Sequence, residues 1–452
     1  MKVTIIGGGG VRTPLVLYGL RQANQTLKIE EVALFDLDHK RMETIARLGR
    51  EVLQQFGSPF SIRIHTRLED AVSGADFVLN SIRVGGVEAR ALDERIALQH
   101  GLAGQETTGP GGAAMALRTV PVVLEYAKKI ERLASSAWLI NLTNPAGLIT
   151  QALLQNTALR VIGICDTPSE LFYSIAKALG EPQSDLRFDY AGLNHLGWIR
   201  RVRLRGEDIT ERILHDRNLL RKLYPADLFD PGLIETLGLI PSEYLFFYYC
   251  QRRAYENQLR AGTTRGQELE RLNSDLFRQI EDASDAQALQ IYTAYLQRRN
   301  ASYLKLESEA ISFAQIPAQE QNPFESATGY HRIALQVISA LTSMEPQHIV
   351  VNVQNRTTIP TLAPEDVIEV LCRIDVNGVH PEPVGALPES VRGLVLSVKA
   401  YERTLIDAAA SGSATMARLA MLEYPLIGQW ELSGEILQSL RRSDRRFLGY
   451  LA

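Results

Sequence analysis

Short apolar runs alternate with amphipathic stretches over the first 170 residues or so of the chain. Runs of this kind are typical of buried strands in a parallel sheet, and the stretches between them have helical spacing. Helices are predicted to begin near Thr13 and Pro14 and to cover 114–133 and 147–154. Strands are predicted at the opening KVTII, at VALFDLD and at 61–65, 76–82, 138–143 and 160–164. The alternation predicts a Rossmann-like, doubly wound parallel sheet of the α/β class.

The pattern changes in the second part of the chain. Charged helices are predicted over much of 216–298, and three amphipathic helices follow from Glu389, while 300–321 favours neither helix nor strand. Strands are predicted at 200–204, 348–355 and 366–374. We therefore expect two domains, a Rossmann-like domain over 1–168 and an α+β domain over 169–452 that packs tightly on it.

The composition narrows the class of protein. The 452 residues are 45% hydrophobic and 22% charged, with a net charge of −4, which argues against a nucleic-acid binder. No apolar run approaches the roughly 20 residues that cross a bilayer, and the N-terminus does not resemble a signal peptide. Three cysteines are too few for a disulfide framework. We expect a cytoplasmic protein in a reducing compartment, without a membrane partner.

The turn after the first strand consists of four glycines and predicts a dinucleotide site. Their small size lets a pyrophosphate approach the backbone and the N-terminus of the next helix. Asp36, at the end of the second strand, is placed to bind the ribose of NAD and disfavours NADP. A strict G-x-G-x-x-G would need glycine where Arg12 stands, so a glycine turn without a ligand remains an alternative. The predicted cofactor residues are Gly7, Gly8, Gly9, Gly10, Asp36 and Ser81.

Cys165 and His195 are candidate metal ligands. Cys165 follows the predicted strand 160–164, at the edge where α/β sheets place ligands. His195 lies in the tight segment GLNHLGW. A thiolate and an imidazole can hold one divalent metal and leave positions open for a substrate. Their separation matches no standard zinc pattern, so a structural thiol and a core histidine remain the alternative.

Two further segments bring polar residues to the same edge. The stretch 83–112 is rich in glycine, contains Arg83 and Arg90, and is predicted to be a long loop. The segment WLINLTNPAG adds Asn141, Thr143 and Asn144.

Motifs along the whole chain resemble those of glycoside hydrolase family 4, and within it most closely the 6-phospho-β-glucosidases. In order they are VTIIGGGG, FDLD, IRVGG, GQETTGPGG, LTNP, CDTP, GLNHLGW and IPSEYLFFYY. The resemblance implies an NAD-dependent glycosidase that does not use a pair of carboxylates. NAD⁺ takes a hydride from C3 of the sugar, a base removes the C2 proton, and the glycosidic oxygen leaves from C1. A divalent metal, expected to be Mn²⁺, polarises the C2 and C3 oxygens. Water then adds and the hydride returns.

The resemblance also implies roles for particular residues. Cys165 and His195 become the metal ligands. The base in such enzymes is a tyrosine, which corresponds to Tyr244, with Tyr248 as second choice. Without the family, core packing is the simpler interpretation of this aromatic segment.

Substrate residues are transferred from the family in the same way. Arg90 and Asn144 correspond to positions that hold the sugar's 6-phosphate, and Asn194 is assigned to the substrate as well. A guanidinium suits a phosphate because it donates paired, charge-assisted hydrogen bonds. The alternative for Arg90 is a surface ion pair with Glu88 or Asp93.

Three positions depart from the β-acting enzymes. Asp166 stands where they usually have asparagine, and in α-acting relatives an acid there is a candidate proton donor. Tyr330 lies in ESATGYHRIAL, where they have a glycine-rich, double-tyrosine segment. Arg12 precedes Thr-Pro, where they have small or aromatic residues. The anomer and the phosphorylation of the sugar therefore stay open.

Three functions remain in view besides the 6-phospho-β-glucosidase. The first keeps the family and mechanism with an α-glucoside, galactoside or uronide, phosphorylated or not. The second is a plain NAD-dependent 2-hydroxy acid dehydrogenase, and the third is a non-catalytic nucleotide-binding protein. The resemblance further implies a homodimer or homotetramer, with the second domain contributing to substrate binding and oligomerisation.

Overall fold

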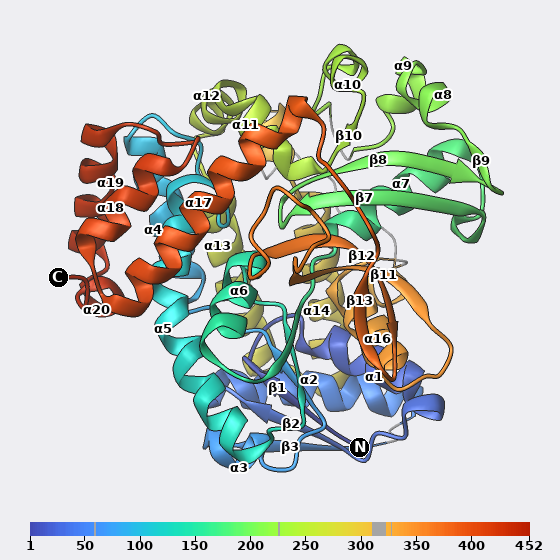
Figure 1. Cartoon of the computed structure of the whole chain (residues 1–452). Helices are drawn as coiled ribbons and strands as arrows, with labels where there is room; N and C mark the ends of the chain where they lie inside the picture. Colours follow the sequence, from blue (N-terminus) through green and yellow to red (C-terminus); the bar gives the residue numbers. More distant parts are fainter. Residues whose placement is uncertain (58–59, 225–226, 310–321, 327) are drawn as a thin grey trace.

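The computed structural model describes residues 1–57, 60–224, 227–309, 322–326 and 328–452. Figure 1 shows the chain wound around one large, twisted sheet, with the N-terminus at its lower end and the C-terminal helices along one side. The described strands form a single mixed sheet in the order β10-β8-β7-β12-β11-β6-β5-β4-β1-β2-β3, with β13 paired to β12 and β9 to β8.

The first six strands are parallel, in the order β3-β2-β1-β4-β5-β6. This is the order of a doubly wound dinucleotide-binding sheet, so the predicted fold class is confirmed. Strands β2 and β3 extend the sheet on one side of β1, whereas β5 and β6 extend it on the other side of β4. This reversal of the strand order opens a crevice at the carboxyl ends of β1 and β4. The strands are β1 (Lys2–Ile6), β2 (Glu31–Phe35), β3 (Ser61–His65), β4 (Phe77–Asn80), β5 (Trp138–Asn141) and β6 (Arg160–Gly163).

Helices connect these strands. Pro14 stands in the first turn of α1, where its missing N–H costs no hydrogen bond. Helices α1 and α2 pack against each other, while α5 packs against α3, α4 and α6. Their bounds are α1 (Thr13–Leu27), α2 (His39–Phe56), α3 (Leu68–Val72), α4 (Gly86–Gln99), α5 (Gly109–Leu133), α6 (Ala146–Asn156) and α7 (Thr167–Leu179).

The prediction of a long loop over 83–112 was wrong. The segment contains the whole of α4 and the first turn of α5. Two glycines with positive φ, Gly85 and Gly86, lead into α4 and give its sequence the look of a loop. The helix also buries Arg90, Asp93 and Glu94, so its polar residues do not mark a solvent face.

The second half adds antiparallel strands to the same sheet. Strand β11 joins β6 through the pair Asn352 and Gly163, then pairs with β12 over its full length. Strands β7 and β8 form a long hairpin beyond β12. The bounds are β7 (Leu186–Leu193), β8 (Leu196–Leu204), β9 (Glu207–Asp208), β10 (Ile240–Pro241), β11 (Gln347–Gln354), β12 (Val367–Asp375) and β13 (Gly378–Pro381). The predicted domain boundary at residue 168 stays a prediction, since strands from both sides of this boundary belong to one sheet.

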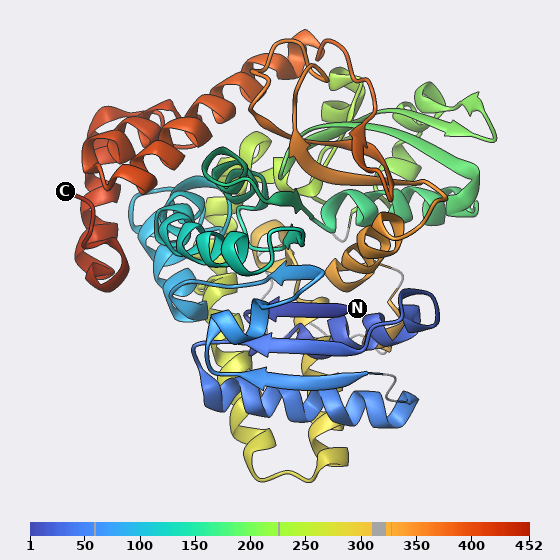
Figure 2. The same ribbon diagram turned by 60° about the horizontal axis from the view of Figure 1, so that its bottom comes forward.

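Helices of the second half cover the first. In Figure 2, α13 and α14 run beneath the parallel strands, where both pack against α2. Helix α17 packs against α5 and α18. The bounds are α8 (Thr210–Leu214), α9 (Arg217–Leu220), α10 (Pro231–Leu237), α11 (Phe246–Tyr249), α12 (Gln251–Ala261), α13 (Arg265–Glu281), α14 (Asp285–Ala301), α15 (Lys305–Glu309), α16 (Tyr330–Leu341), α17 (Glu389–Ser411), α18 (Ala414–Glu423), α19 (Trp430–Ser443) and α20 (Arg445–Leu448), with short 3₁₀ turns at η1 (Gln183–Asp185), η2 (Glu243–Leu245) and η4 (Pro323–Glu325).

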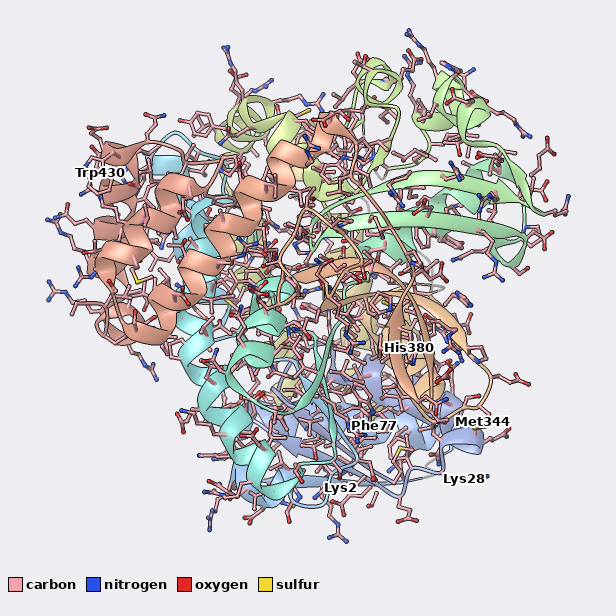
Figure 3. The ribbon with its side chains drawn as sticks, viewed as in Figure 1. Lys2, Lys28, Phe77, Met344, His380 and Trp430 are labelled. Carbon is pink, nitrogen blue, oxygen red and sulfur yellow. The ribbon has the colours of Figure 1, made fainter. Side chains whose placement is uncertain are left out.

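Exposed apolar side chains are scattered over the surface. Met344 and Trp430, 79% and 47% exposed, lie on opposite sides of the molecule in Figure 3. Among the described helices, none combines the length and apolar character required to cross a bilayer.

Candidate active site

A deep cleft of about 1750 Å³ opens at the carboxyl ends of the parallel strands. Both halves of the chain line it. The first half supplies the glycine turn, Asp36, Ser81, Arg83, Arg90, Glu106, Asn144, Asp166 and Glu170, and the second supplies Glu243, Tyr244, Arg265, Arg299, Tyr303 and Tyr330. The cleft therefore collects most of the predicted cofactor and substrate residues.

The glycine turn has no room for side chains. Gly7 has φ +86°, and a Cβ built on it would lie 2.5 Å from the carbonyl oxygen of Ser81. A Cβ on Gly9 would lie 2.9 Å from Asp36 Oδ2, which accepts a hydrogen bond from Gly9 N at 2.9 Å. The backbone at the start of α1 thus stays uncovered, as a pyrophosphate requires.

Cys165 and His195 meet although 30 residues separate them. Cys165 follows β6, and His195 stands in the turn of the β7–β8 hairpin with φ +61°. The distance from Cys165 Sγ to His195 Nε2 is 3.3 Å. Both side chains are buried. Cys165 precedes Asp166 in the chain and His195 stacks on Tyr244, and both of these neighbours line the cleft.

Burial sets the protonation of this pair. It lowers the pKa of His195 to about 4, so the imidazole is neutral at pH 7. Burial, then the neighbouring Glu369 and Asp166, raise the pKa of the Cys165 thiol well above its usual value. A thiolate here needs a compensating positive charge, which a divalent cation supplies.

The donor set fits an open cation site. No group of three or more histidine, cysteine, aspartate or glutamate side chains with metal-binding geometry occurs in the described part of the chain. Two protein ligands, next to the cleft-lining residues Asp166 and Tyr244, would leave the other coordination positions to substrate oxygens and water, as in catalytic sites. A closed structural site would have four protein ligands.

The ring of Tyr244 stacks on that of His195, with centroids 3.8 Å apart and planes at 9°. The Tyr248 hydroxyl lies 2.9 Å from that of Tyr424, and Tyr248 is absent from the described lining of the cleft. Burial, followed by Glu106 and Glu243, raises the pKa of the Tyr244 phenol well above its usual value. Tyr244 therefore needs a nearby cation to act as a base at neutral pH.

Buried carboxyl groups lie around Tyr244, and two of them, Glu243 and Glu170, were not predicted. Burial raises the pKa of Glu243 to about 7, and its Oε1 accepts a hydrogen bond from the Tyr303 hydroxyl at 2.5 Å. Burial also raises the pKa of Asp166 and, together with Asp166 and Glu243, that of Glu170. Only Asp166 carried a sequence signal, because it adjoins the candidate cysteine.

Arg90 is buried and paired with two carboxylates. Its Nε donates to Glu94 and its Nη1 to Glu106, each at 2.7 Å. The alternative interpretation, a surface ion pair of Arg90 with Glu88 or Asp93, was wrong, since Arg90 is buried and Asp93 pairs with Arg118. Helical spacing places Glu94 one turn from Arg90, whereas Glu106 is brought there by the fold.

The two predicted asparagines differ in their surroundings. Asn144 lines the cleft, and its buried Oδ1 has no hydrogen-bond partner among the described residues. Asn194 bonds Glu369 through Nδ2 at 3.0 Å and accepts from Gly147 N at 3.4 Å. Asn144 is therefore free to receive a ligand, while Asn194 anchors the turn that carries His195.

Arg265 and Arg299 were missed by the sequence analysis. Arg265 donates to Ser302 and to the carbonyl of Arg299, and Arg299 donates to the Tyr295 hydroxyl. Neither forms an ion pair with a described carboxylate. Burial and then the neighbouring Arg299 lower the pKa of Arg265 to about 10. Two adjacent cations in a cleft favour an anionic ligand.

The three departures from the family pattern converge in space. The Arg12 guanidinium lies 4.7 Å from the ring centroid of Tyr330, and its charge lowers the pKa of Asp166 against the dominant effect of burial. All three line the cleft. They therefore form one contact group, although more than 300 residues separate Arg12 from Tyr330.

Two family models match most of the chain. "Family 4 glycosyl hydrolase" covers residues 2–181, and "Family 4 glycosyl hydrolase C-terminal domain" covers residues 190–427. The chain belongs to glycosyl hydrolase family 4. The predicted resemblance is confirmed, and membership of a glycosyl hydrolase family sets aside the plain dehydrogenase and the non-catalytic protein.

Family 4 members named as β-glucosidases and members named as α-glucosidases are both similar to this chain over nearly its full length. A probable 6-phospho-beta-glucosidase of Bacillus subtilis is 31% identical over 460 residues, covering 99% of this chain and 97% of that protein. A phospho-alpha-glucosidase of Clostridium acetobutylicum is 26% identical over 463 residues, covering 99% and 98%. The structure of the 6-phospho-beta glucosidase from Thermotoga maritima with manganese, NAD⁺ and glucose-6-phosphate superposes with a TM-score of 0.81, at 27% identity and 99% coverage of both chains.

Proposed function

We propose that this family 4 enzyme hydrolyses a 6-phospho-β-glucoside, with NAD and a divalent cation, preferably Mn²⁺, as cofactors. The observation that carries the proposal is the contact of Cys165 with His195, whose ring stacks on Tyr244, a residue that lines the same cleft as the glycine turn. The similarity to the Bacillus subtilis and Thermotoga maritima enzymes supports the β-glucoside.

The cofactor residues are assigned by their chemistry. Cys165 and His195 would hold the cation, and the glycine turn with Asp36 and Ser81 would hold NAD. When bound, NAD supplies hydride acceptance and return at C3, and the cation supplies polarisation of the sugar's oxygens.

Two residues of the chain move protons. Tyr244 removes the C2 proton through its phenolic oxygen, and its stacking on His195 keeps it beside the cation site that must lower its pKa. Asp166 gives a proton to the leaving glycosidic oxygen, a role that suits a buried carboxyl with a raised pKa.

The 6-phosphate is assigned to Asn144 and Arg90, with Arg265 and Arg299 in addition. Arg90 already shares its charge with Glu94 and Glu106, so it alone would attract a dianion weakly. Arg265 and Arg299 bring positive charge to the same cleft without a described ion pair. Asn194 remains a predicted substrate residue whose amide also anchors the turn.

The deciding experiment is hydrolysis of a matched set of aryl glycosides with Mn²⁺, NAD⁺ and a reductant in deuterated water. The set contains the 6-phospho-β-glucoside, its α-anomer and the β-glucoside without phosphate. We expect turnover of the phosphorylated β-anomer and deuterium at C2 of the product. Full turnover by enzyme stripped of NAD would contradict the mechanism. Turnover of only the α-anomer or only the unphosphorylated sugar would contradict the assigned substrate.

We further infer a cytoplasmic homodimer or homotetramer. Phosphorylated sugars and NAD are intracellular molecules, which supports the compartment. Light scattering at micromolar concentration would report the mass, and a monomer would contradict the inferred assembly.

A further inference from the structure

The side-chain oxygen of Gln105 is fixed by backbone hydrogen bonds. The N–H groups of Thr107 and Thr108 donate to Gln105 Oε1 over 2.5 Å and 2.9 Å. An amide nitrogen at this position would face two donors, so the backbone itself identifies the atom as oxygen. The Oε1 atom of Gln105 therefore accepts hydrogen bonds from its neighbours and has no proton to donate.

The Thr107 hydroxyl stands between this oxygen and His195. Thr107 Oγ1 lies 2.9 Å from Gln105 Oε1 and 2.9 Å from His195 Nδ1. Two oxygens this close share a proton, and only the hydroxyl has one, so Thr107 donates to Gln105. Its lone pairs then face the imidazole, and Nδ1 carries the ring proton.

A neutral imidazole has one N–H, so Nε2 carries a lone pair, and Nε2 is the atom 3.3 Å from Cys165 Sγ. We propose that Gln105 and Thr107 form a hydrogen-bond relay that holds His195 in the Nδ1–H tautomer and so keeps Nε2 available to a divalent cation. In the opposite tautomer, Nε2–H would occupy the lone-pair direction and block coordination. Both are positioning residues, and the inference rests on the proposed cation site.

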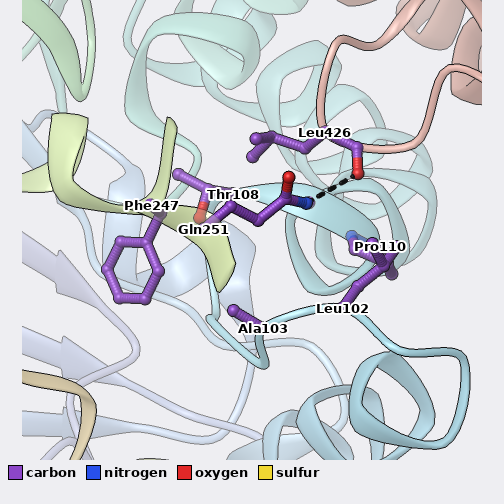
Figure 4. A pocket seen from close by; sticks show the side chains of 8 residues that line it. Leu102, Ala103, Thr108, Pro110, Phe247, Gln251 and Leu426 are labelled. Atoms are coloured by element: carbon purple, nitrogen blue, oxygen red, sulfur yellow. Dashed lines mark hydrogen bonds between the residues drawn. The ribbon is translucent and has the colours of Figure 1, made fainter. Parts of the chain in front are cut away.

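The packing behind the relay supports this role. Gln105 and Thr107 are 6% and 8% exposed. Figure 4 shows the cavity next to Thr108, whose volume of about 10 Å³ admits at most one water. Gln251, which also lines this cavity, donates to the carbonyl of Leu426 at 3.1 Å, drawn as a dashed line.

Two variants of Thr107 separate the effect of its hydroxyl from the effect of its side-chain shape. Thr107→Val removes the hydroxyl and keeps the shape, while Thr107→Ser keeps the hydroxyl. Nitrogen-15 NMR of metal-free protein, with the His195 signal assigned through His195→Gln, reads the tautomer without catalysis. Equilibrium titration followed by electron paramagnetic resonance reads Mn²⁺ affinity.

We expect Nδ1–H in the wild type and in Thr107→Ser. In Thr107→Val, the population should shift towards Nε2–H and Mn²⁺ affinity should fall about 10- to 100-fold. The NAD affinity of the same preparation, unchanged within about twofold, shows that the variant is folded. An unaltered tautomer and Mn²⁺ affinity in Thr107→Val would overturn the relay.

Gln105→Met provides a second test if Thr107→Val does not fold. Without the Gln105 oxygen, the hydroxyl is free to donate to Nδ1, which favours Nε2–H. Retention of Nδ1–H in this variant contradicts the relay. A wild-type protein that binds no Mn²⁺ would instead refute the proposed cation site, and the tautomer measurement distinguishes these two failures.

Discussion

The Tyr244 ring lies parallel to the His195 imidazole, with centroids 3.8 Å apart. The proposed base and the proposed cation ligand are therefore in direct contact. A substitution that keeps the ring and removes the phenolic oxygen can therefore separate the role of the oxygen from the role of the ring.

Tyr244→Phe should keep this stacking and lose the base. We expect kcat to fall about 10²- to 10⁴-fold, the usual contribution of a positioned acid or base, with Mn²⁺ affinity unchanged. Steady-state kinetics with Mn²⁺ titration measures both. Tyr248→Phe is the matched control, because it loses the bond to Tyr424 and should cost about 1 kcal/mol of stability while activity remains. The reverse pattern would make Tyr248 the base.

Cys165→Ser should weaken the cation site. A serine hydroxyl stays neutral where the cysteine can become a thiolate, so the site loses a negative charge, and we expect Mn²⁺ affinity to fall at least about 10-fold and activity to need excess Mn²⁺. Cys372, equally buried but in β12, supplies the control. Cys372→Ser should lower the free energy of unfolding and leave Mn²⁺ binding intact. Treatment of the wild type with a chelator should abolish hydrolysis reversibly, and hydrolysis that persists in chelator would refute the cation requirement.

Glu243 should make stability depend on pH. The fold raises its pKa from 4.5 to about 7, chiefly by burial, so the folded state binds this proton more tightly than the unfolded state. The resulting stabilisation is complete below pH 4.5 and is lost as pH rises to 7. Glu243→Gln cannot ionise and should gain roughly 1–3 kcal/mol relative to the wild type between pH 5 and pH 8. Urea unfolding at the two pH values measures this, and an equal difference at both would contradict the shifted pKa.

The sequence predicted what depends on local pattern. The parallel strands other than β3 were found because each is an apolar run that ends at a turn, and Cys165 and Asp166 were placed correctly because they follow such a run. Helix α4 was missed because buried charged pairs conceal its apolar face, as with Arg90 and Glu94. The segments that pack against α4 come from other parts of the chain.

Contacts between residues far apart in the chain could not be predicted from the sequence. The bond between Thr107 and His195 joins residues 88 positions apart, and no periodicity marks it. Arg265 likewise reads as one of many arginines at a helix start, and only the fold brings it to the cleft beside Arg299. The motif GQETTGPGG was recognised as a family signature, but no pattern in the chain explained its glutamine and threonine.

Arg265→Gln tests the anion site. If the pair Arg265 and Arg299 receives the 6-phosphate, loss of one charge-assisted contact worth about 1.5–3 kcal/mol should raise KM for the phosphorylated substrate about 10- to 100-fold, with a smaller change in kcat. Urea unfolding of the variant checks folding, because the substitution removes the bonds to Ser302 and to the Arg299 carbonyl while it relieves the repulsion from Arg299. Arg278→Gln is the control on the same helix, exposed and paired with Asp275, and should leave KM unchanged. A KM that is unaffected by Arg265→Gln, or that rises equally for the unphosphorylated sugar, would place the phosphate elsewhere in the cleft.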